Sequence, residues 1–195
     1  MKQSSNTSLA VLAATTFAAA CYLLLKRHSG NSVPSLINQN TYTTMTDKNL
    51  PRGYRNNNPC NIRISAANPW RGKIYPNTDG LFEQFDSLEN GYRAALALLR
   101  GDGYIGKGIN TIEKIITKFA PPKENDTQGY INYVSNYTGI PKNKVISKHD
   151  KNSLINIVYA MSLVENNTSE PVKIQAVKNA GLPNIELVKK GWNLL

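Results

Sequence analysis

The sequence predicts a mainly helical domain with one small β-hairpin, preceded by a transmembrane helix. Three observations indicate this fold class. Apolar residues recur at helical spacing through most of the second half of the chain, only one pair of short segments is typical of a hairpin, and an uncharged apolar stretch lies near the N-terminus. The 195 residues suffice for one domain of ordinary size and an appendage, and the 41% hydrophobic content allows a core.

The N-terminal part is predicted to be a membrane anchor. After a short segment, 1–8, the 17 residues of 9–25 carry no charge. A helix of 17 residues spans about 25 Å, slightly less than the hydrocarbon core of roughly 30 Å, and snorkelling of Lys26 and Arg27 would close the difference. A lipoprotein signal at Cys21, a cleaved signal peptide and a buried helix remain alternatives, and the topology is open. We expect a single-pass membrane protein.

The segment 26–50 is rich in Ser, Thr and Asn without a sustained period, which predicts a flexible linker. The globular domain is expected to cover 51–195. The chain carries a formal charge of +10, and this domain holds most of the excess of Lys and Arg over Asp and Glu.

Each expected helix has a start or stop signal. Ser87 and Thr111 can cap the first two, Pro121 stops the second, Asp126 or Thr127 opens the third, and Gly139 ends it. A fourth helix spans about 151–165, Pro171 can start a fifth, and a short last helix reaches Gly191. The expected hairpin pairs 73–75 with 81–85 around the turn 76–80.

Several classes of chemistry are excluded by what the chain lacks. Two Cys and two His, without CxxC or HExxH spacing, leave no set of zinc ligands. The chain also has no Walker A or GxGxxG loop for a nucleotide. We therefore expect neither a metal nor an organic cofactor.

One carboxylate stands at the end of an apolar stripe. In the fourth expected helix the stripe runs through Leu154, Val158 and Met161, and Glu165 is the next position at helical spacing. Partial burial would raise the pKa of this carboxyl group, which is what a general acid needs. A small error in the phase of the helix would instead turn Glu165 to solvent.

Two loop segments carry further polar candidates. Three consecutive Asn followed by Pro, at 56–59, cannot continue a helix, and Asn amides suit sugar hydroxyl and acetamido groups as well as turn formation. The segment 120–127 places two carboxylates before a helix. Asp126 can cap that helix, which leaves Glu124 as a second candidate acid.

Several segments together resemble a family of phage and bacterial proteins whose domain is related to lysozymes and lytic transglycosylases. Members carry an RNNNPGNIR start and an AP-x-x-ENDT centre. The resemblance spans about 51–182 and rests on RGYRNNNPCNIR at 52–63, Trp70-Arg71-Gly72, 82–85, GYRAALALL at 91–99, FAPPKENDT at 119–127 and YINYV at 130–134.

The resemblance implies an α+β lysozyme-like fold and a set of site residues. The acidic helix end follows the Asn-rich loop here, whereas it precedes such a loop in lytic transglycosylases, so a circular permutation is expected. Glu165 corresponds to the catalytic acid, and Glu124 is a second candidate. Asn58, Asn61 and Arg63 would line the cleft, and Tyr130 would contact sugar.

Two departures from the family pattern affect these expectations. Cys60 and Asn167 each stand where the family has Gly, so a positive φ at either position would be strained or differently shaped.

The implied function is cleavage of the N-acetylmuramic acid–N-acetylglucosamine bond of peptidoglycan, by a lytic transglycosylase or a muramidase. The protein would be phage-encoded, carried on a virion membrane or the bacterial inner membrane, and its partners would be glycan strands, the lipid membrane through 9–25, and other virion proteins. One alternative is a wall-binding structural virion protein without activity. Another is a membrane-tethered nucleic-acid binder, suggested by the +10 charge and ten Tyr but opposed by the dispersed Lys and Arg.

Overall fold

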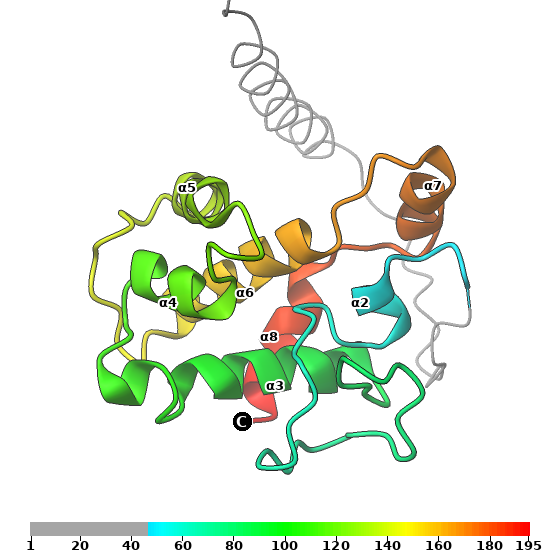
Figure 1. The fold of residues 1–195 in the computed structure, drawn as a ribbon, viewed down its shortest axis with the longest axis horizontal. Coiled ribbons are helices and arrows are strands. Elements are labelled where there is room, and N and C mark those ends of the chain that lie inside the picture. Colours follow the sequence, from blue (N-terminus) through cyan, green and yellow to red (C-terminus); the bar gives the residue numbers. More distant parts are fainter. Residues whose placement is uncertain (1–46) are drawn as a thin grey trace, which may run out of the picture. The chain divides into compact units, whose positions relative to one another are not determined.

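The computed structural model describes residues 47–195, which belong to one compact unit. The expected short N-terminal segment, the expected anchor at 9–25 and most of the expected linker lie outside the described residues. Figure 1 shows the helices, which in chain order are α2 (Arg52–Arg55), α3 (Leu88–Arg100), the 3₁₀ helix η1 (Ile105–Lys107), α4 (Ile112–Phe119), α5 (Thr127–Thr138), α6 (Lys151–Glu165), α7 (Pro171–Asn179) and α8 (Ile185–Asn193).

The predicted helix boundaries are confirmed by side-chain caps. Ser87 accepts from the Asn90 amide at the start of α3, Thr111 from the Lys114 amide at the start of α4, and Asp126 from the Gly129 amide at the start of α5. Each cap satisfies one of the amides that the first turn of a helix leaves unpaired. Gly139, with φ of 69°, ends α5 in the left-handed conformation, and Pro171 begins α7.

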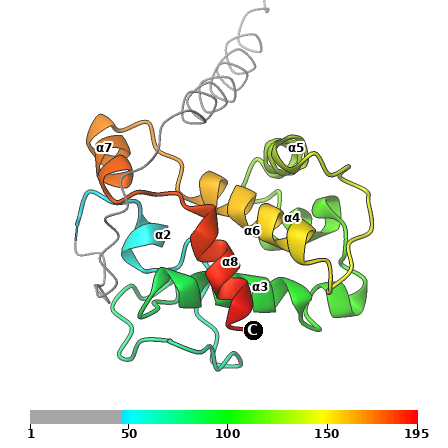
Figure 2. The same cartoon turned by 180° about the vertical axis from the view of Figure 1, so that it is seen from behind.

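The helix α6 forms the centre of the core. Most of its residues between Leu154 and Ser162 are buried, and α5, α3 and α8 pack around it. Both views show α8 lying against α3, with α6 beside them (Figures 1 and 2). The Tyr92 hydroxyl of α3 lies 3.3 Å from the Ser162 hydroxyl of α6, which joins the two helices by a buried hydrogen bond.

The predicted hairpin is not formed, and the expected α+β fold is therefore wrong. The described residues contain no strand, only isolated antiparallel bridges, Arg63–Phe82 and Lys73–Phe85. The pairing is shared among three segments: the Glu83 amide donates to the Ile62 carbonyl, whereas the Ile74 amide donates to the Gln84 carbonyl. Because 81–85 divides its backbone bonds between two neighbours, neither pairing extends into a strand.

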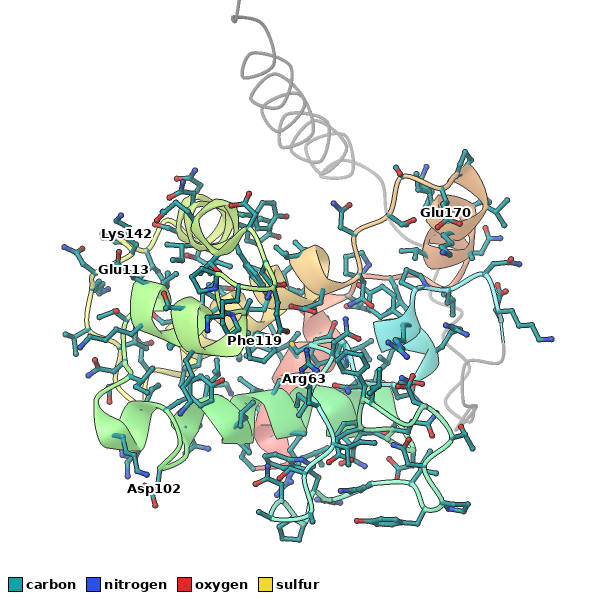
Figure 3. The ribbon with its side chains drawn as sticks, in the orientation of Figure 1. Arg63, Asp102, Glu113, Phe119, Lys142 and Glu170 are labelled. Carbon is teal, nitrogen blue, oxygen red and sulfur yellow. The ribbon has the colours of Figure 1, made fainter. Side chains whose placement is uncertain are left out.

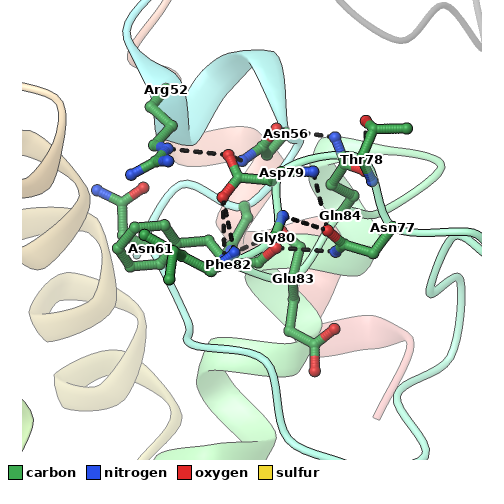
Figure 4. Close-up of polar contacts among 12 residues, drawn as sticks. Arg52, Asn56, Asn61, Asn77, Thr78, Asp79, Gly80, Phe82, Glu83 and Gln84 are labelled. Atoms are coloured by element: carbon green, nitrogen blue, oxygen red, sulfur yellow. Dashed lines mark hydrogen bonds and ion pairs between the residues drawn. The ribbon is translucent and has the colours of Figure 1, made fainter.

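Polar side chains hold the segment that the hairpin was expected to stabilise. Asp79 accepts hydrogen bonds from Arg52, Asn56 and the amide of Phe82 (Figure 4). Burial by itself would raise the pKa of Asp79, but these hydrogen bonds outweigh it and lower the pKa. The loop is thus fixed by charge-assisted bonds rather than by a β-ladder.

A buried ion pair reinforces the same segment. The Lys73 ammonium lies 2.9 Å from the Glu83 carboxylate, and the two side chains are only 6% and 0% exposed. The same Glu83 oxygen accepts from the Ser65 amide at 3.0 Å. A buried charge persists only when it is paired and hydrogen-bonded, so this pair ties the loop after Ile64 to the bridge region.

The prediction of a transmembrane helix with single-pass membrane attachment finds no support and is corrected. Within residues 47–195, no helix combines the length and the apolar character needed to span a bilayer. The longest of them, α6, has 15 residues. At about 1.5 Å per residue such a helix falls well short of a hydrocarbon core roughly 30 Å thick.

The contact between α8 and α3 yields the first prediction. A Cβ at Gly191 would lie 2.8 Å from the Arg93 amide nitrogen and 2.9 Å from the Glu89 carbonyl oxygen of α3. We expect Gly191→Ala to lower the free energy of unfolding by about 2 kcal/mol, because overpacking outweighs the better helix propensity of Ala. Urea unfolding measures this change.

Gly103→Ala is the matched control, since a Cβ there meets no atom within 4 Å. Equal stability of the two variants would contradict the close approach of α8 to α3.

Candidate active site

The carboxyl group of Glu165 lies at the end of α6, where the sequence placed it. Leu154, Val158 and Met161, which precede it on the same stripe, are at most 1% exposed. Glu165 itself is half-buried, and α6 ends at this residue. The predicted phase of the helix is therefore confirmed, and the stripe carries a carboxylate to the edge of the core.

Two side chains from distant parts of the chain hold this carboxyl group. The Tyr130 hydroxyl, from α5, donates to Oε1 of Glu165 at 3.1 Å. The Asn61 amide, from the loop after α2, donates to Oε2 at 3.0 Å and to the Glu165 backbone carbonyl at 3.1 Å. Each carboxyl oxygen thus has one donor, and the Asn-rich loop meets the end of α6 and the start of α5.

Burial and hydrogen bonding act on Glu165 in opposite directions. Desolvation by burial raises its pKa, while the hydrogen bonds from Asn61 and Tyr130 lower it, and burial prevails, so the pKa lies above the ordinary value of 4.5. The raised pKa keeps the proton on this carboxyl group at a higher pH than on an exposed glutamate.

The Asn-rich loop owes its shape to two left-handed residues and one buried amide. Asn57 and Asn61 have φ of 50° and 46°, a conformation that Asn tolerates better than most residues. Asn58 is fully buried, donates to the carbonyls of Ile62 and Glu83 and accepts from the Ile62 amide. Asn58 therefore builds the loop that presents Asn61, with its amide committed to the protein backbone.

Arg63 and Glu124 form an ion pair with each other. Their charged atoms are 2.9 Å apart, and the side chains are 68% and 61% exposed. Figure 3 labels Arg63 in the loop that follows Asn61, and Glu124 precedes α5 in the chain. An exposed pair of this kind contributes less than about 1 kcal/mol, so it can open at little cost.

Two further carboxylates of the domain, those of Asp126 and Asp86, have structural bonds. Asp126 caps α5 by accepting from the Gly129 amide at 3.0 Å. Asp86 accepts from the Asn90 side chain at 2.7 Å and from the Ser87 hydroxyl at 3.1 Å. Glu165 is therefore the candidate whose carboxyl group combines partial burial with a raised pKa.

The two replacements of Gly fall at positions without backbone strain. Among residues 47–195, positive φ occurs at Asn57, Asn61 and five glycines, and neither Cys60 nor Asn167 belongs to this set. Cys60 is fully buried, and burial together with the nearby Glu165 raises the pKa of its thiol. The thiol of Cys60 donates to the Val158 carbonyl of α6 at 3.7 Å, and its side chain packs as a small buried group.

Sequence reasoning missed the role of Asn166. Its side chain is 6% exposed and donates to the Pro59 carbonyl at 2.7 Å and to the Ser162 carbonyl at 2.9 Å. Its position directly after Glu165 was the available signal. As for metals, no cluster of three or more His, Cys, Asp or Glu side chains that could hold an ion occurs in 47–195.

Comparison with known proteins places the chain in a family. It is 36% identical over 129 residues to Protein P5 of Pseudoalteromonas phage PM2, an alignment that covers 65% of this chain and 78% of the relative. No family model matches the chain. The chain therefore belongs to the family of Protein P5, and this relationship indicates a phage origin.

The raised pKa of Glu165 predicts a specific pH dependence of stability. A group that binds its proton more tightly in the folded state loses stabilising effect as the pH rises from the unfolded pKa through the folded pKa. We expect Glu165→Gln to match the wild type at about pH 4 and to become increasingly more stable than it as the pH rises above 4.5, the ordinary value. The Gln side chain can donate to the Tyr130 oxygen and accept from Asn61, so no new buried group loses its partner.

The measurement is urea unfolding of both proteins across this pH range, with the exposed Glu124→Gln as control. A stability difference that does not grow with pH for Glu165→Gln would show that the folded-state pKa of Glu165 is not raised.

Proposed function

We propose that this member of the Protein P5 family cleaves the N-acetylmuramic acid–N-acetylglucosamine bond of peptidoglycan, as a lytic transglycosylase-type glycosidase with Glu165 as its general acid and base. The observation that carries the proposal is the half-buried Glu165 carboxyl group, with raised pKa, between Asn61 and Tyr130. The resemblance of the Asn-rich loop and the ENDT segment to lysozyme-related proteins supports the same chemistry.

In the first step, the protonated Glu165 gives its proton to the glycosidic oxygen. The bond from the anomeric carbon to this oxygen breaks, and the leaving sugar departs with the proton as a hydroxyl group. The carboxylate that remains accepts hydrogen bonds from Asn61 and Tyr130, which stabilise its new negative charge.

In the second step, the same carboxylate acts as a base. The C6 hydroxyl of the muramic acid attacks its own anomeric carbon, and Glu165 takes the proton of that hydroxyl group. A 1,6-anhydro ring forms, the acid is regenerated, and no water is consumed. The two reaction steps use a single carboxyl group for both proton transfers.

The surroundings of Glu165 favour this route over hydrolysis. A glycoside hydrolase needs a second carboxyl group, either as nucleophile about 5–5.5 Å away or as base about 6.5–9.5 Å away. Asp126 caps α5 and Asp86 is bonded to Ser87 and Asn90, whereas Glu124 forms only a weak exposed pair with Arg63 and is tested as a second carboxyl group by its own variant below. A mechanism with one carboxyl group fits this distribution of roles.

The charge of the protein and its relative support a cell-wall substrate. The chain carries a formal charge of +10, which suits the anionic bacterial wall. Protein P5 belongs to a phage, and a phage has to cross that wall.

Removal of the acid tests the proposal directly. We expect Glu165→Gln to lower the rate of peptidoglycan cleavage by about a thousandfold, because general acid–base catalysis contributes roughly 10²–10⁴. Muropeptides released from purified peptidoglycan are identified by mass spectrometry, and a 1,6-anhydro product is expected from the wild type.

Glu124→Gln is the matched control, with a loss below about fivefold, the limit set by an exposed ion pair. A reducing-end product would identify a hydrolase. Binding of the wild type to peptidoglycan without released muropeptides would favour the alternative of a wall-binding structural virion protein.

The hydroxyl of Tyr130 yields a further prediction. Tyr130→Phe removes a hydrogen bond that lowers the pKa of Glu165, so this pKa rises further. Because the reaction needs the protonated acid, the fall of kcat/KM toward alkaline pH should move to higher pH. The maximum rate should drop about tenfold, since the carboxylate loses one of its two donors.

The pH–rate profile of both proteins provides the measurement. An unchanged alkaline limb in Tyr130→Phe would contradict the role of this hydroxyl group.

A further inference from the structure

Three oxygen atoms converge on the α-carbon of Gly53, in α2. A Cβ at this position would lie 2.3 Å from Oδ1 of Asn166 and 3.0 Å from both the Asn58 carbonyl oxygen and Oδ1 of Asn61. Two of these oxygens belong to the side chains that touch or follow Glu165. Any residue with a Cβ at position 53 would therefore have to displace these three oxygen atoms.

The side-chain oxygens of Asn61 and Asn166 can lie close to α2 because Gly53 has no side chain. Neither Oδ1 of Asn61 nor Oδ1 of Asn166 accepts a conventional hydrogen bond in the described part of the chain. Both face the Gly53 α-carbon, whose C–H group can form a weak hydrogen bond with a carbonyl oxygen. The orientation of both amides is set by their nitrogens, which donate elsewhere.

Asn166 ties the end of α6 to the Asn-rich loop. Its amide nitrogen donates to the Pro59 carbonyl at 2.7 Å and to the Ser162 carbonyl at 2.9 Å. The first bond crosses 107 positions of sequence and fixes the distance between the loop and the residue next to Glu165. Asn61 lies two residues after Pro59, so the bond between Asn166 and the Pro59 carbonyl also restricts the position of the Asn61 side chain.

We propose that Gly53 and Asn166 are positioning residues that hold the Asn61 amide against the Glu165 carboxyl group. Asn166 sets the distance between α6 and the Asn-rich loop. Because Gly53 has no side chain, the amide groups of Asn61 and Asn166 can approach the backbone of α2. The effect of these residues on catalysis rests on the proposed function, whereas their effect on the position of the Asn61 amide and on the pKa of Glu165 does not.

The expected consequence of a side chain at position 53 follows from the double use of the Asn61 nitrogen. This nitrogen donates both to Oε2 and to the backbone carbonyl of Glu165. A shift of the amide by a few tenths of an ångström weakens both bonds, because hydrogen bonds decline steeply outside their preferred geometry. The acid would then keep its burial and lose one of its two donors.

Gly53→Ala tests the proposal through the titration of Glu165. With ¹³C-labelled glutamate, NMR follows the Glu165 carboxyl resonance against pH, and Glu165→Gln assigns it. We expect the titration midpoint to move to higher pH in Gly53→Ala, since the Asn61 bond lowers the pKa. Gly103→Ala, with free space at its Cβ, should leave the midpoint unchanged.

Asn166→Ala gives an independent test that introduces no collision. The midpoint should again move to higher pH, and kcat on peptidoglycan should fall about tenfold with little change in KM. The neighbouring exposed residue provides the matched control, because Asn167→Ala changes the same residue type one position along the chain.

The double variant Gly53→Ala/Asn166→Ala covers the case in which Gly53→Ala alone unfolds. It lacks the oxygen that the new Cβ meets at 2.3 Å. If Gly53→Ala does not fold, we expect the double variant to fold. If Gly53→Ala folds, we expect the melting temperature of the double variant to exceed the value obtained by adding the two single losses, as residues in contact do not behave additively.

An unshifted Glu165 midpoint in both folded single variants, or strictly additive losses in the double variant, would overturn the proposal. The proposed function fails separately: a wild type that releases no muropeptide would refute it, while the titration shifts would still establish the positioning roles.

Discussion

The carboxyl group of Glu165 lies where α5, α6 and the Asn-rich loop meet, and its pKa depends on a balance between burial and hydrogen bonding. Burial raises the pKa, whereas Asn61 and Tyr130 lower it by donating to the two oxygens. The balance exists only if α5, α6 and the Asn-rich loop keep their mutual positions. The buried surface of α6, with Leu154, Ile157 and Val158 at 0% exposure, provides a frame on which small displacements are costly.

The loop on the other side of the acid is held by polar bonds. Asp79 gathers Arg52, Asn56 and the Phe82 amide, and the Lys73–Glu83 pair is almost fully enclosed. Such interactions depend strongly on geometry, because breaking one partner leaves a buried charge uncompensated. A loop fixed in this way can place Asn61 as firmly as a strand would, although the described residues contain no strand.

The spacing of residues predicted the local parts of this arrangement, and the family resemblance led us to expect Asn61, Tyr130 and Glu165 at one site, where hydrogen bonds join them. Other tertiary contacts were missed. Residue spacing revealed the helix caps Ser87, Thr111 and Asp126, because a cap depends on residues a few positions apart. The same holds for the helical phase of α6, which brings Glu165 to the edge of the core. The hairpin was wrong because residues 81–85 divide their bonds between two neighbours. The convergence of Asn61 and Asn166 on Gly53 joins segments more than 100 positions apart, and no local pattern encodes it.

The position of the acid at a helix end adds a further physical reason for its proposed role. Glu165 is the last residue of α6, and the carbonyl end of a helix carries a partial negative charge that disfavours a carboxylate. Helix end and burial therefore both favour the protonated form of Glu165, and the fully buried Cys60, whose thiol pKa is raised, offers no compensating positive charge. Within the described residues, the groups that favour the charged form are the donors Asn61 and Tyr130, both neutral. A neutral donor stabilises the anion without fixing it as an Arg or Lys would, so the carboxyl group can release its proton and take one back, as a mechanism with one carboxyl group requires.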